Sequence, residues 1–399
     1  MTRTFCGPFV DYGEDLNFFV PEEKGKHDGG LSKSLFVDDT VKTPEAAIIE
    51  TKKKFAPYWI NSPPLLAGYV DEMGEAFLFF LSEELKGRIV LLEFIDLFQP
   101  HSLRGLPYTK EWLRRYGGAG LSVISVYNSS FGFEKNLELI AQTAHQLGIQ
   151  NPLLVDHDNA VWRALENRYW PRRILFNNEQ KIIADHIGAG GYQEMEQEIQ
   201  AALRLLSPGL ACPRLMPPLN ATDEKAHELK LRPPAFFGFK RGELGNAEEL
   251  SPDANEVVFA MPPVPQENTA YLSGPWLGTE VSTYLSGVLY EKGQYSGNAA
   301  ACITFSGGTL YLLCSSRNYL QTDATTSIRA QIYLDSKPVR DTLKGADVKS
   351  EAKKQFITVH EPRLFEVVKS VPEGNHRLDI VLDPSCVDLF EIFAVYFMP

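Results

Sequence analysis

The sequence predicts an α/β domain followed by an all-β sandwich domain of the jelly-roll kind. From Lys86 to about Ser207, apolar runs of strand length alternate with segments of helical periodicity, the pattern of α/β domains. From Ala270 to Pro399, short β-forming runs are separated by turn signals, as in sandwiches. A chain of 399 residues is also too long for one ordinary core.

The chain divides into four predicted parts. Residues 1–56 form an irregular N-terminal arm with a short helix around Pro44–Lys54, residues 57–207 the α/β domain, and residues 266–399 the β-sandwich. Residues 208–265 contain many prolines. Because proline cannot donate a backbone hydrogen bond, this part is expected to be a surface linker with at most short strands.

The α/β domain is predicted element by element from its periodicity. A fully apolar run indicates a strand covered on both faces, and recurring apolar residues at helical spacing indicate a helix. Asn177–Gln180 is a hairpin signal. The predicted strands are Arg88–Asp96, Leu121–Tyr127, Pro152–Val155, Arg172–Phe176 and Lys181–Ile187, and the predicted helices are Leu103–Tyr116, Glu134–Leu147, Asn159–Asn167 and Gln193–Leu206.

In the sandwich, a tight turn at Gly307-Gly308 is expected to join two strands as a hairpin, with Cys302 and Cys314 as separate core thiols. Aromatic residues there either fill the core or form a platform for a sugar. The aromatics concerned are Trp276, Tyr284, Tyr290, Tyr295 and Tyr319. The predicted strands are Ala300–Phe305, Thr309–Cys314, Ile328–Leu334, Leu364–Val368, Arg377–Leu382 and Phe390–Phe397.

Composition excludes several classes of partner. The formal net charge is −12 and no long Lys/Arg run occurs, so nucleic acid is not an expected partner. Five cysteines are scattered without a CxxC pair, which argues against a zinc site. No signal peptide and no membrane span are visible. We therefore expect a cytoplasmic protein, or a periplasmic or other extracytoplasmic one if the given chain is a trimmed form.

Several motifs between residues 57 and 207 resemble one known family. They are Trp59-Ile-Asn-Ser-Pro-Pro-Leu65, Leu106-Pro107-Tyr108, Phe131-Gly-Phe-Glu-Lys135, Asp158-Asn-Ala-Val-Trp162, Asn167-Arg-Tyr-Trp-Pro171 and Gly190-Gly191-Tyr192. This part is similar to the TlpA/DipZ-like thiol–disulfide oxidoreductases, which implies a thioredoxin-like fold. The second half resembles the β-sandwich that follows the thioredoxin domain in some DipZ-type proteins, through Leu272-Ser-Gly-Pro-Trp276, Tyr333-Leu-Asp335, Pro362-Arg-Leu-Phe365 and Phe393-Ala-Val-Tyr-Phe397.

The turn Gln99-Pro100-His101-Ser102 departs from this family. The resemblance places the family's Cys-x-x-Cys pair on it, with Gln99 and Ser102 at the two cysteine positions. Disulfide exchange needs an attacking thiolate and a second thiol that resolves the mixed disulfide. Neither an amide nor a hydroxyl can replace them, so we expect no disulfide exchange at this turn.

Two other features carry over from the resemblance. Glu93 matches the family's buried acid, and is either a core carboxylate with raised pKa and a polar partner or a general base. Trp170-Pro171 matches the family's cis-proline pair, which implies either inherited loop geometry or a backbone edge that pairs with an extended peptide. With the turn Gln99–Ser102, this pair forms the candidate binding groove.

Other arrangements of residues have both a chemical and a structural interpretation. His101 and Ser102 could act as base and nucleophile, but a helix cap by Ser102 or a neighbour is the expected role. Gly188–Gly191 resembles a phosphate loop but lacks a following Lys-Ser/Thr. Asp156-His157-Asp158 is typical of a turn with a helix cap rather than of a metal site. We therefore expect neither a metal nor a cofactor.

Three functions remain open from the sequence. The first is a redox-inactive, thioredoxin-like binding or scaffold protein whose partner is a peptide or protein. The second is a thiol–disulfide oxidoreductase that uses a displaced cysteine such as Cys212. The third is a carbohydrate-binding sandwich carried by the α/β domain. No catalytic residue is assigned in the first and third.

Overall fold

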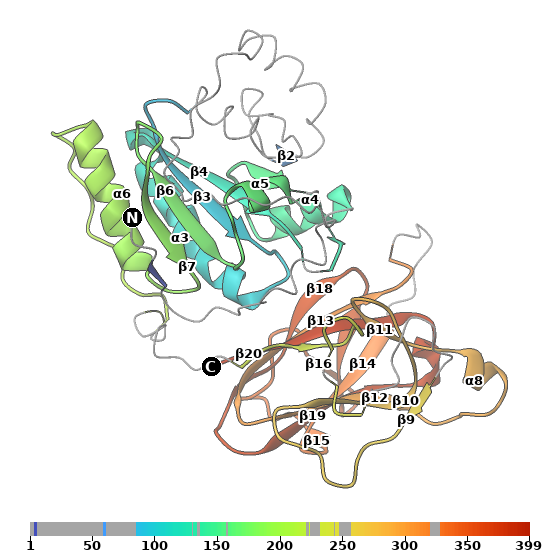
Figure 1. Cartoon of the computed structure of the whole chain (residues 1–399). Coiled ribbons are helices and arrows are strands. Elements are labelled where there is room, and N and C mark those ends of the chain that lie inside the picture. Colours follow the sequence, from blue (N-terminus) through green and yellow to red (C-terminus); the bar gives the residue numbers. More distant parts are fainter. Residues whose placement is uncertain are drawn as a thin grey trace, which may run out of the picture. The chain divides into compact units, whose positions relative to one another are not determined.

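The chain folds into two compact units, seen in a computed structural model (Figure 1). One comprises Met1–Leu97 and His101–Lys230, and the other comprises Phe98–Pro100 and Leu231–Pro399. The structure describes residues 4–5, 59–60, 85–129, 131–133, 136–156, 159–220, 223, 232–242, 244–246, 257–319 and 328–399. The predicted helix at Pro44–Lys54 and the cysteine Cys6 lie outside these residues.

The first unit is built on a seven-stranded mixed sheet with the order β1-β7-β6-β3-β4-β5-β2. Its central strand β3 runs parallel to β4 and antiparallel to β6. The hairpin signal at 177–180 joins β6 to its antiparallel neighbour β7, as predicted. The strands are β1 Thr4–Phe5, β2 Trp59–Ile60, β3 Ile89–Ile95, β4 Leu121–Tyr127, β5 Leu153–Val155, β6 Arg172–Phe176 and β7 Ile182–Ile187.

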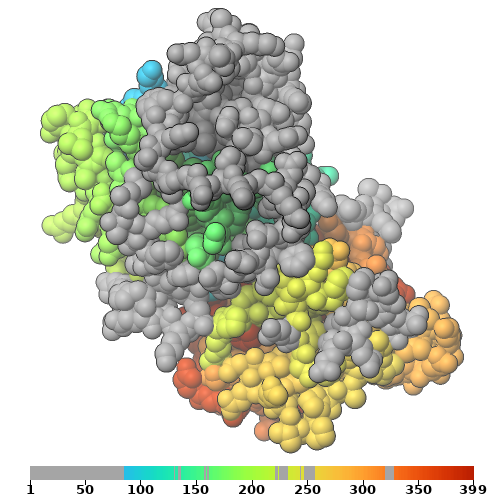
Figure 2. Space-filling model, in the orientation of Figure 1, coloured from blue at the N-terminus to red at the C-terminus, as the bar shows by residue number. Residues whose placement is uncertain are grey.

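Helices cover both faces of this sheet. Figure 1 shows α6 on one side and α4 and α5 on the other. Helix α6 also lies at the surface of its unit, at the left of Figure 2. The helices are α3 Pro100–Tyr116, α4 Leu137–Gln146, α5 Ala160–Ala164 and α6 Tyr192–Leu206, with a 3₁₀ turn at Gly117–Ala119. Within the described part of the chain, no helix combines the length and the hydropathy needed to cross a bilayer.

Alternation along β3 decides which side chain meets which helix. Every residue of β3 is buried, and successive side chains point to opposite faces of a sheet. Leu92 packs into the cluster that includes Trp162 of α5. Leu91 packs into the cluster that includes Trp112 of α3. Glu93 therefore lies on the α3 face, where it must find polar partners.

The second unit is a curled antiparallel sheet that closes on one hydrophobic core, as the predicted sandwich requires. Its principal strand order is β16-β17-β14-β19-β12-β10-β11-β20-β13-β18. The strands are β8 Ala235–Phe236, β9 Val257–Phe259, β10 Ala270–Gly278, β11 Thr283–Leu285, β12 Ala299–Phe305, β13 Gly308–Ser316, β14 Ile328–Leu334, β15 Lys337–Pro338, β16 Lys349–Glu351, β17 Lys354–Val359, β18 Arg363–Val371, β19 His376–Leu382 and β20 Phe390–Met398, with helix α8 at Val288–Glu291 and a 3₁₀ turn at Pro384–Cys386.

The predicted hairpin at Gly307-Gly308 was wrong. Strand β12 pairs with β10 and β19, whereas β13 pairs with β18 and β20. The chain therefore crosses to a different part of the sheet at the two glycines, which have φ values of 108° and 96°. A Cβ on Gly307 would lie 2.6 Å from the Pro372 carbonyl oxygen, so a side chain does not fit here. Cys302 and Cys314 are free, buried thiols.

Residues 208–265, predicted as a linker, are shared between the units. The first part packs on the α/β unit, where Met216 is buried and its carbonyl oxygen accepts a 2.9 Å hydrogen bond from the Gln193 side chain. Strands β8 and β9 pair with β20 and β10 of the sandwich. Residues from Leu231 onward belong to the second unit.

Candidate functional site at the strand–helix turn

The turn that replaces the Cys-x-x-Cys motif lies between β3 and α3. It contains no sulfur atom, and helix α3 begins within it, at Pro100. The exposed fractions are 1% for Gln99, 2% for His101 and 0% for Ser102. The turn is thus buried rather than presented at the surface.

Ser102 does not act as the terminal cap of α3. It is the third residue of the helix, and its hydroxyl oxygen accepts a 3.2 Å hydrogen bond from the Asp96 backbone N–H. The bond ties the first turn of α3 back to the end of β3. The hydroxyl is thereby used as an acceptor in holding the turn.

His101 is neutral near pH 7. Burial, aided by the nearby positive charge of Arg104, lowers its pKa to about 4. Burial is the larger of these two causes. Its ring Nδ1 is buried without a hydrogen-bond partner among the described residues.

The strand pairing brings Trp170-Pro171 to the same end of the sheet as the turn. Strands β3 and β6 are antiparallel, with Phe94 opposite Arg172. The residues that follow β3 and those that precede β6 therefore lie at the same end of the sheet. The Trp170–Pro171 peptide bond is cis. The Pro171 carbonyl oxygen accepts a 2.8 Å hydrogen bond from the Gly188 N–H, and Trp170 is 2% exposed.

Glu93 is held by two polar partners in the interior. Its Oε1 lies 3.0 Å from Arg173 Nε of β6 and accepts a 3.1 Å hydrogen bond from the Thr109 hydroxyl of α3. The exposed fraction is 0% for both Glu93 and Arg173. Desolvation by burial raises the pKa of Glu93, and the charge of Arg173 opposes part of that rise.

The Arg173 guanidinium is enclosed by α3 and α6. Its central carbon lies 4.8 Å from the centre of the Tyr192 ring, a cation–π contact. Tyr192 in turn stacks on Tyr108 of α3 at 3.9 Å between ring centres. A Cβ on Gly105 would lie 2.0 Å from Arg173 Nη2. Only glycine at position 105 therefore leaves room for this guanidinium under α3.

His186 of the neighbouring strand β7 is a further polar residue beside Arg173. It lies opposite Arg173 in the β6–β7 register. Burial and the charge of Arg173 lower its pKa to about 3. Its ring fills the place of a side chain at Gly191, where a Cβ would lie 1.8 Å from Cε1. The glycine loop that resembled a phosphate site is thus packed around an imidazole.

Arg173 and His186 were missed as site residues by the sequence analysis. A signal was present, because Arg172 and Arg173 open a strand that reads as buried. Buried arginines require acidic partners. Arg172 has one in Asp185, at 2.7 Å, and Arg173 has Glu93. A buried acid on the central strand, such as Glu93, therefore predicts a buried basic partner on a neighbouring strand.

The described cysteines differ sharply in their surroundings. In the sandwich, burial raises the pKa of Cys302 to about 12 and that of Cys386 to about 11, and raises that of Cys314 strongly. These thiols are protonated near pH 7, so they are poor nucleophiles. Cys212, in the first unit, is the one described cysteine that is not buried.

Other predicted candidates have structural roles. Asp156 accepts hydrogen bonds from the N–H groups of Val161 and Trp162 at 3.1 and 2.9 Å, which caps α5; His157 and Asp158 lie outside the described residues. Trp276 is fully buried in the sandwich core, so it cannot contribute to a sugar platform. The Tyr290 hydroxyl donates to a backbone carbonyl, and the Tyr284 ring lies under Arg317.

No family model matches the chain. Protein DipZ of Mycobacterium bovis is 29% identical over 195 residues, which is 49% of this chain and 28% of DipZ. The same values hold for DipZ of Mycobacterium tuberculosis. SUPPRESSOR OF QUENCHING 1, a chloroplastic protein of Arabidopsis thaliana, is 26% identical over 36% of this chain and 12% of its own length.

Solved structures with a likeness include a secreted disulfide oxidoreductase of Mycobacterium tuberculosis that is homologous to DsbE of E. coli. It is 12% identical, with a TM-score of 0.25, over 29% of this chain and 84% of that one. The first unit is an α/β domain built on a mixed sheet. The match to DipZ relates about half of this chain to the DipZ/TlpA-like thioredoxin-fold proteins. The chain spans under a third of the length of the DipZ proteins.

Proposed function

We propose that this protein is a redox-inactive, thioredoxin-like binding or scaffold protein with an appended β-sandwich. The observation that carries the proposal is the turn itself, where Gln99 and Ser102 replace both cysteines. An amide cannot attack a disulfide, and a hydroxyl cannot resolve a mixed disulfide. The partner would be an extended peptide or protein that binds at Gln99–Ser102 and Trp170-Pro171.

The pairing of Glu93 supports the loss of redox chemistry. A buried acid can move protons for a nearby thiol only if its carboxyl group can change protonation state and reach that thiol. Here Glu93 Oε1 is bound by both Arg173 and Thr109. The carboxyl group is therefore held towards α3 and β6 as part of the core.

Peptide binding at the former active site would follow the β-augmentation mode. In that mode, main-chain groups of a strand edge pair with an extended segment. The residues that precede β6 lie at the end of the sheet beside the turn, where Trp170 and the turn are buried.

An insulin-reduction assay tests the redox part of the proposal. We expect no turnover by the wild-type protein with dithiothreitol as electron donor. The double variant Gln99→Cys, Ser102→Cys restores both sulfur positions, so it should gain activity if only sulfur is missing. The matched control is Gln99→Ala, Ser102→Ala. Wild-type turnover that persists in this control would locate the exchange elsewhere and refute the proposal.

Calorimetric titration with the oxidised insulin B chain, an extended peptide, tests the binding part. Wild-type protein should bind it, and Pro171→Asp, which places a charge at the groove, should weaken binding by about tenfold or more. Unchanged binding by Pro171→Asp would move the binding site away from the groove. If the wild-type protein binds no extended peptide, this part of the proposal fails.

The alternative function is a thiol–disulfide oxidoreductase that uses a displaced cysteine, and one observation favours it. Cys212 is partly exposed and belongs to the first unit, whereas the described sandwich thiols are buried. Titration of the native thiols with a chromogenic disulfide distinguishes the two functions. Two results together would favour the oxidoreductase. The first is a single fast-reacting thiol with a depressed pKa that disappears in Cys212→Ser, and the second is loss of insulin reduction in the same variant.

A further inference from the structure

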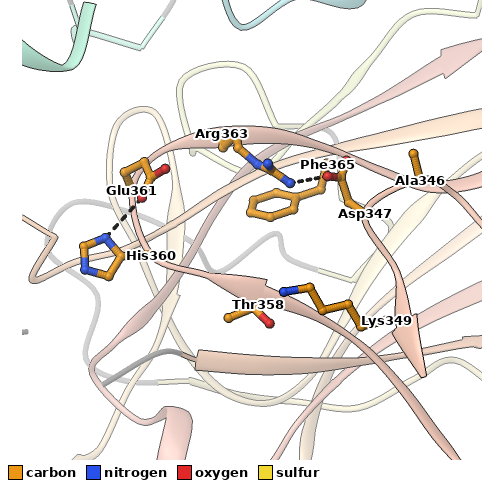
Figure 3. A pocket seen from close by; sticks show the side chains of 8 residues that line it. All are labelled: Ala346, Asp347, Lys349, Thr358, His360, Glu361, Arg363 and Phe365. Atoms are coloured by element: carbon orange, nitrogen blue, oxygen red, sulfur yellow. Dashed lines mark hydrogen bonds and ion pairs between the residues drawn. The ribbon is translucent and has the colours of Figure 1, made fainter. Parts of the chain in front are cut away.

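A polar cavity of about 280 Å³ lies in the sandwich and shares no residue with the strand–helix turn. Figure 3 shows its walls, which come from β16, β17, β18, the connection between β17 and β18, and the segment before β16. At this connection the chain passes from one part of the curled sheet to another. The lining residues are Ala346, Asp347, Lys349, Thr358, His360, Glu361, Arg363 and Phe365.

The acidic side chains of the cavity already have partners in the protein. Asp347 Oδ1 pairs with Arg363, and Asp347 Oδ2 accepts a 2.7 Å hydrogen bond from the Glu366 N–H. Glu361 lies 3.1 Å from the His360 ring. The charge of Arg363 is thus partly balanced from within, and Asp347 is held in a fixed orientation.

Among the described residues, Lys349 is the cavity cation that lacks such a partner. Figure 3 shows its ammonium group extending towards Thr358, with the Arg363 guanidinium on the opposite wall. None of the ion pairs formed between described residues includes Lys349. A negative group bound between the two cations would interact favourably with both, while the Thr358 hydroxyl could donate a hydrogen bond to it.

We propose that this cavity binds a small monocarboxylate that also carries hydroxyl or amino groups. The carboxylate would lie beside Lys349 and Thr358, and its hydrogen-bond donors would meet the carboxylate oxygens of Glu361 and Asp347. A dianion such as phosphate is disfavoured because two carboxylates line the same space.

A neutral sugar is disfavoured for a different reason, which is that the aromatic face in the lining is already covered. Phe365 is the aromatic residue of the lining, and it is 2% exposed. The guanidinium of Arg363 lies over its ring at 4.4 Å. Stacking of a sugar ring on this side chain would require Arg363 to leave its partner Asp347.

Calorimetric titration of the full chain with gluconate tests the inference, and sorbitol is the matched neutral ligand. The two compounds share the same polyol chain and differ in one carboxylate. We expect gluconate to bind and added salt to weaken it, whereas sorbitol should bind at least tenfold more weakly. Lys349→Gln should lower gluconate affinity by about tenfold or more, because a hydrogen bond to a charged group is lost.

The variant Lys354→Gln is the matched control. Lys354 is an exposed lysine on the neighbouring strand β17 and does not line the cavity, so its loss should leave affinity unchanged. Equal binding of gluconate and sorbitol, or equal loss in both variants, would overturn the proposal. Tighter binding of inorganic phosphate than of gluconate would overturn the assignment to a monocarboxylate.

Discussion

At the scale of single residues, Glu93 and Arg173 form a fully buried ion pair in the interior of the α/β unit. Two opposite charges without solvent exposure are costly to bury, and each depends on the other for compensation. The cost of losing one partner is therefore larger than the net contribution of the pair. This asymmetry makes the pair a sensitive test of the described geometry.

Replacing Arg173 by methionine should destabilise the α/β unit by about 3–5 kcal/mol, because Glu93 would remain buried without its counter-charge. Urea unfolding followed by tryptophan fluorescence measures the change, since Trp112, Trp162 and Trp170 all lie in this unit. The control is Arg114→Met, which removes a largely exposed pair with Glu111 and should change the stability much less. Equal effects would contradict the buried pair.

His186 should make the same unit sensitive to acid. Its pKa is about 3 in the folded protein and 6.5 without perturbation, so the unfolded state binds more protons between these values. Stability is therefore fully present above pH 6.5 and is lost as pH falls, by about 2 kcal/mol between pH 6.5 and 5. Arg173 and Asp185 are the charged groups that act on this ring.

Unfolding free energies measured from pH 7 to pH 5 check this effect against the variant His186→Asn, which cannot titrate. The variant should be less stable at pH 7 but should lose less stability on acidification. Parallel pH profiles for the two proteins would show that another group causes the acid sensitivity.

At the scale of elements, helix α3 lies close to β6 because Gly105 has no side chain. Alanine normally stabilises a helix relative to glycine by about 1 kcal/mol. Here a Cβ would meet Arg173 Nη2 at 2.0 Å, and Arg173 cannot move without leaving Glu93. Gly105→Ala should therefore destabilise the unit by about 1–3 kcal/mol.

Combining Gly105→Ala with Arg173→Met tests the contact directly. In a protein that already carries Arg173→Met, the alanine should cost much less or become favourable, so the two changes should not be additive. Gly118→Ala is the control, since a Cβ at Gly118 meets no atom within 4 Å. Additive effects of the two changes would mean that Gly105 and Arg173 are not in contact.

Elements with a strong local pattern were predicted well. Strands β4 and β6 were predicted at their observed bounds, and α6 to within one residue, because a buried strand and an amphipathic helix carry their periodicity in the sequence. The failures were long-range. The Gly307-Gly308 step looks like a hairpin locally, yet whether its flanking strands pair is decided by β10, β18, β19 and β20, which no local pattern reveals.

The same distinction applies to the candidate site. The absent sulfur at Gln99 and Ser102 could be found from the sequence, because it depends on identity at aligned positions. The burial of the turn, the partners of Glu93 and the polar cavity around Lys349 depend on side chains from separate strands. Charge and residue type could suggest such partners, but only sheet register brings them together.

At the scale of the whole molecule, the chain contains separate hydrophobic cores. The sandwich core is one continuous cluster from Phe237 to Phe397, and the α/β sheet has its own clusters on its two faces. A unit that buries its own core has the main requirement for folding alone. The short strands β8 and β9 pair with sandwich strands, so a fragment that starts at residue 266 would lose them.

We therefore expect residues 231–399 to fold alone as a β protein with a cooperative thermal transition, and residues 266–399 to be clearly less stable. Circular dichroism and thermal unfolding of both fragments measure this. The difference arises because removing residues 231–265 exposes the backbone groups of β20 and β10 that paired with β8 and β9. It also removes the buried side chains of Phe237 and Phe259 from the core. Equal stability of the two fragments would show that the segment before residue 266 is a linker, as its prolines suggested.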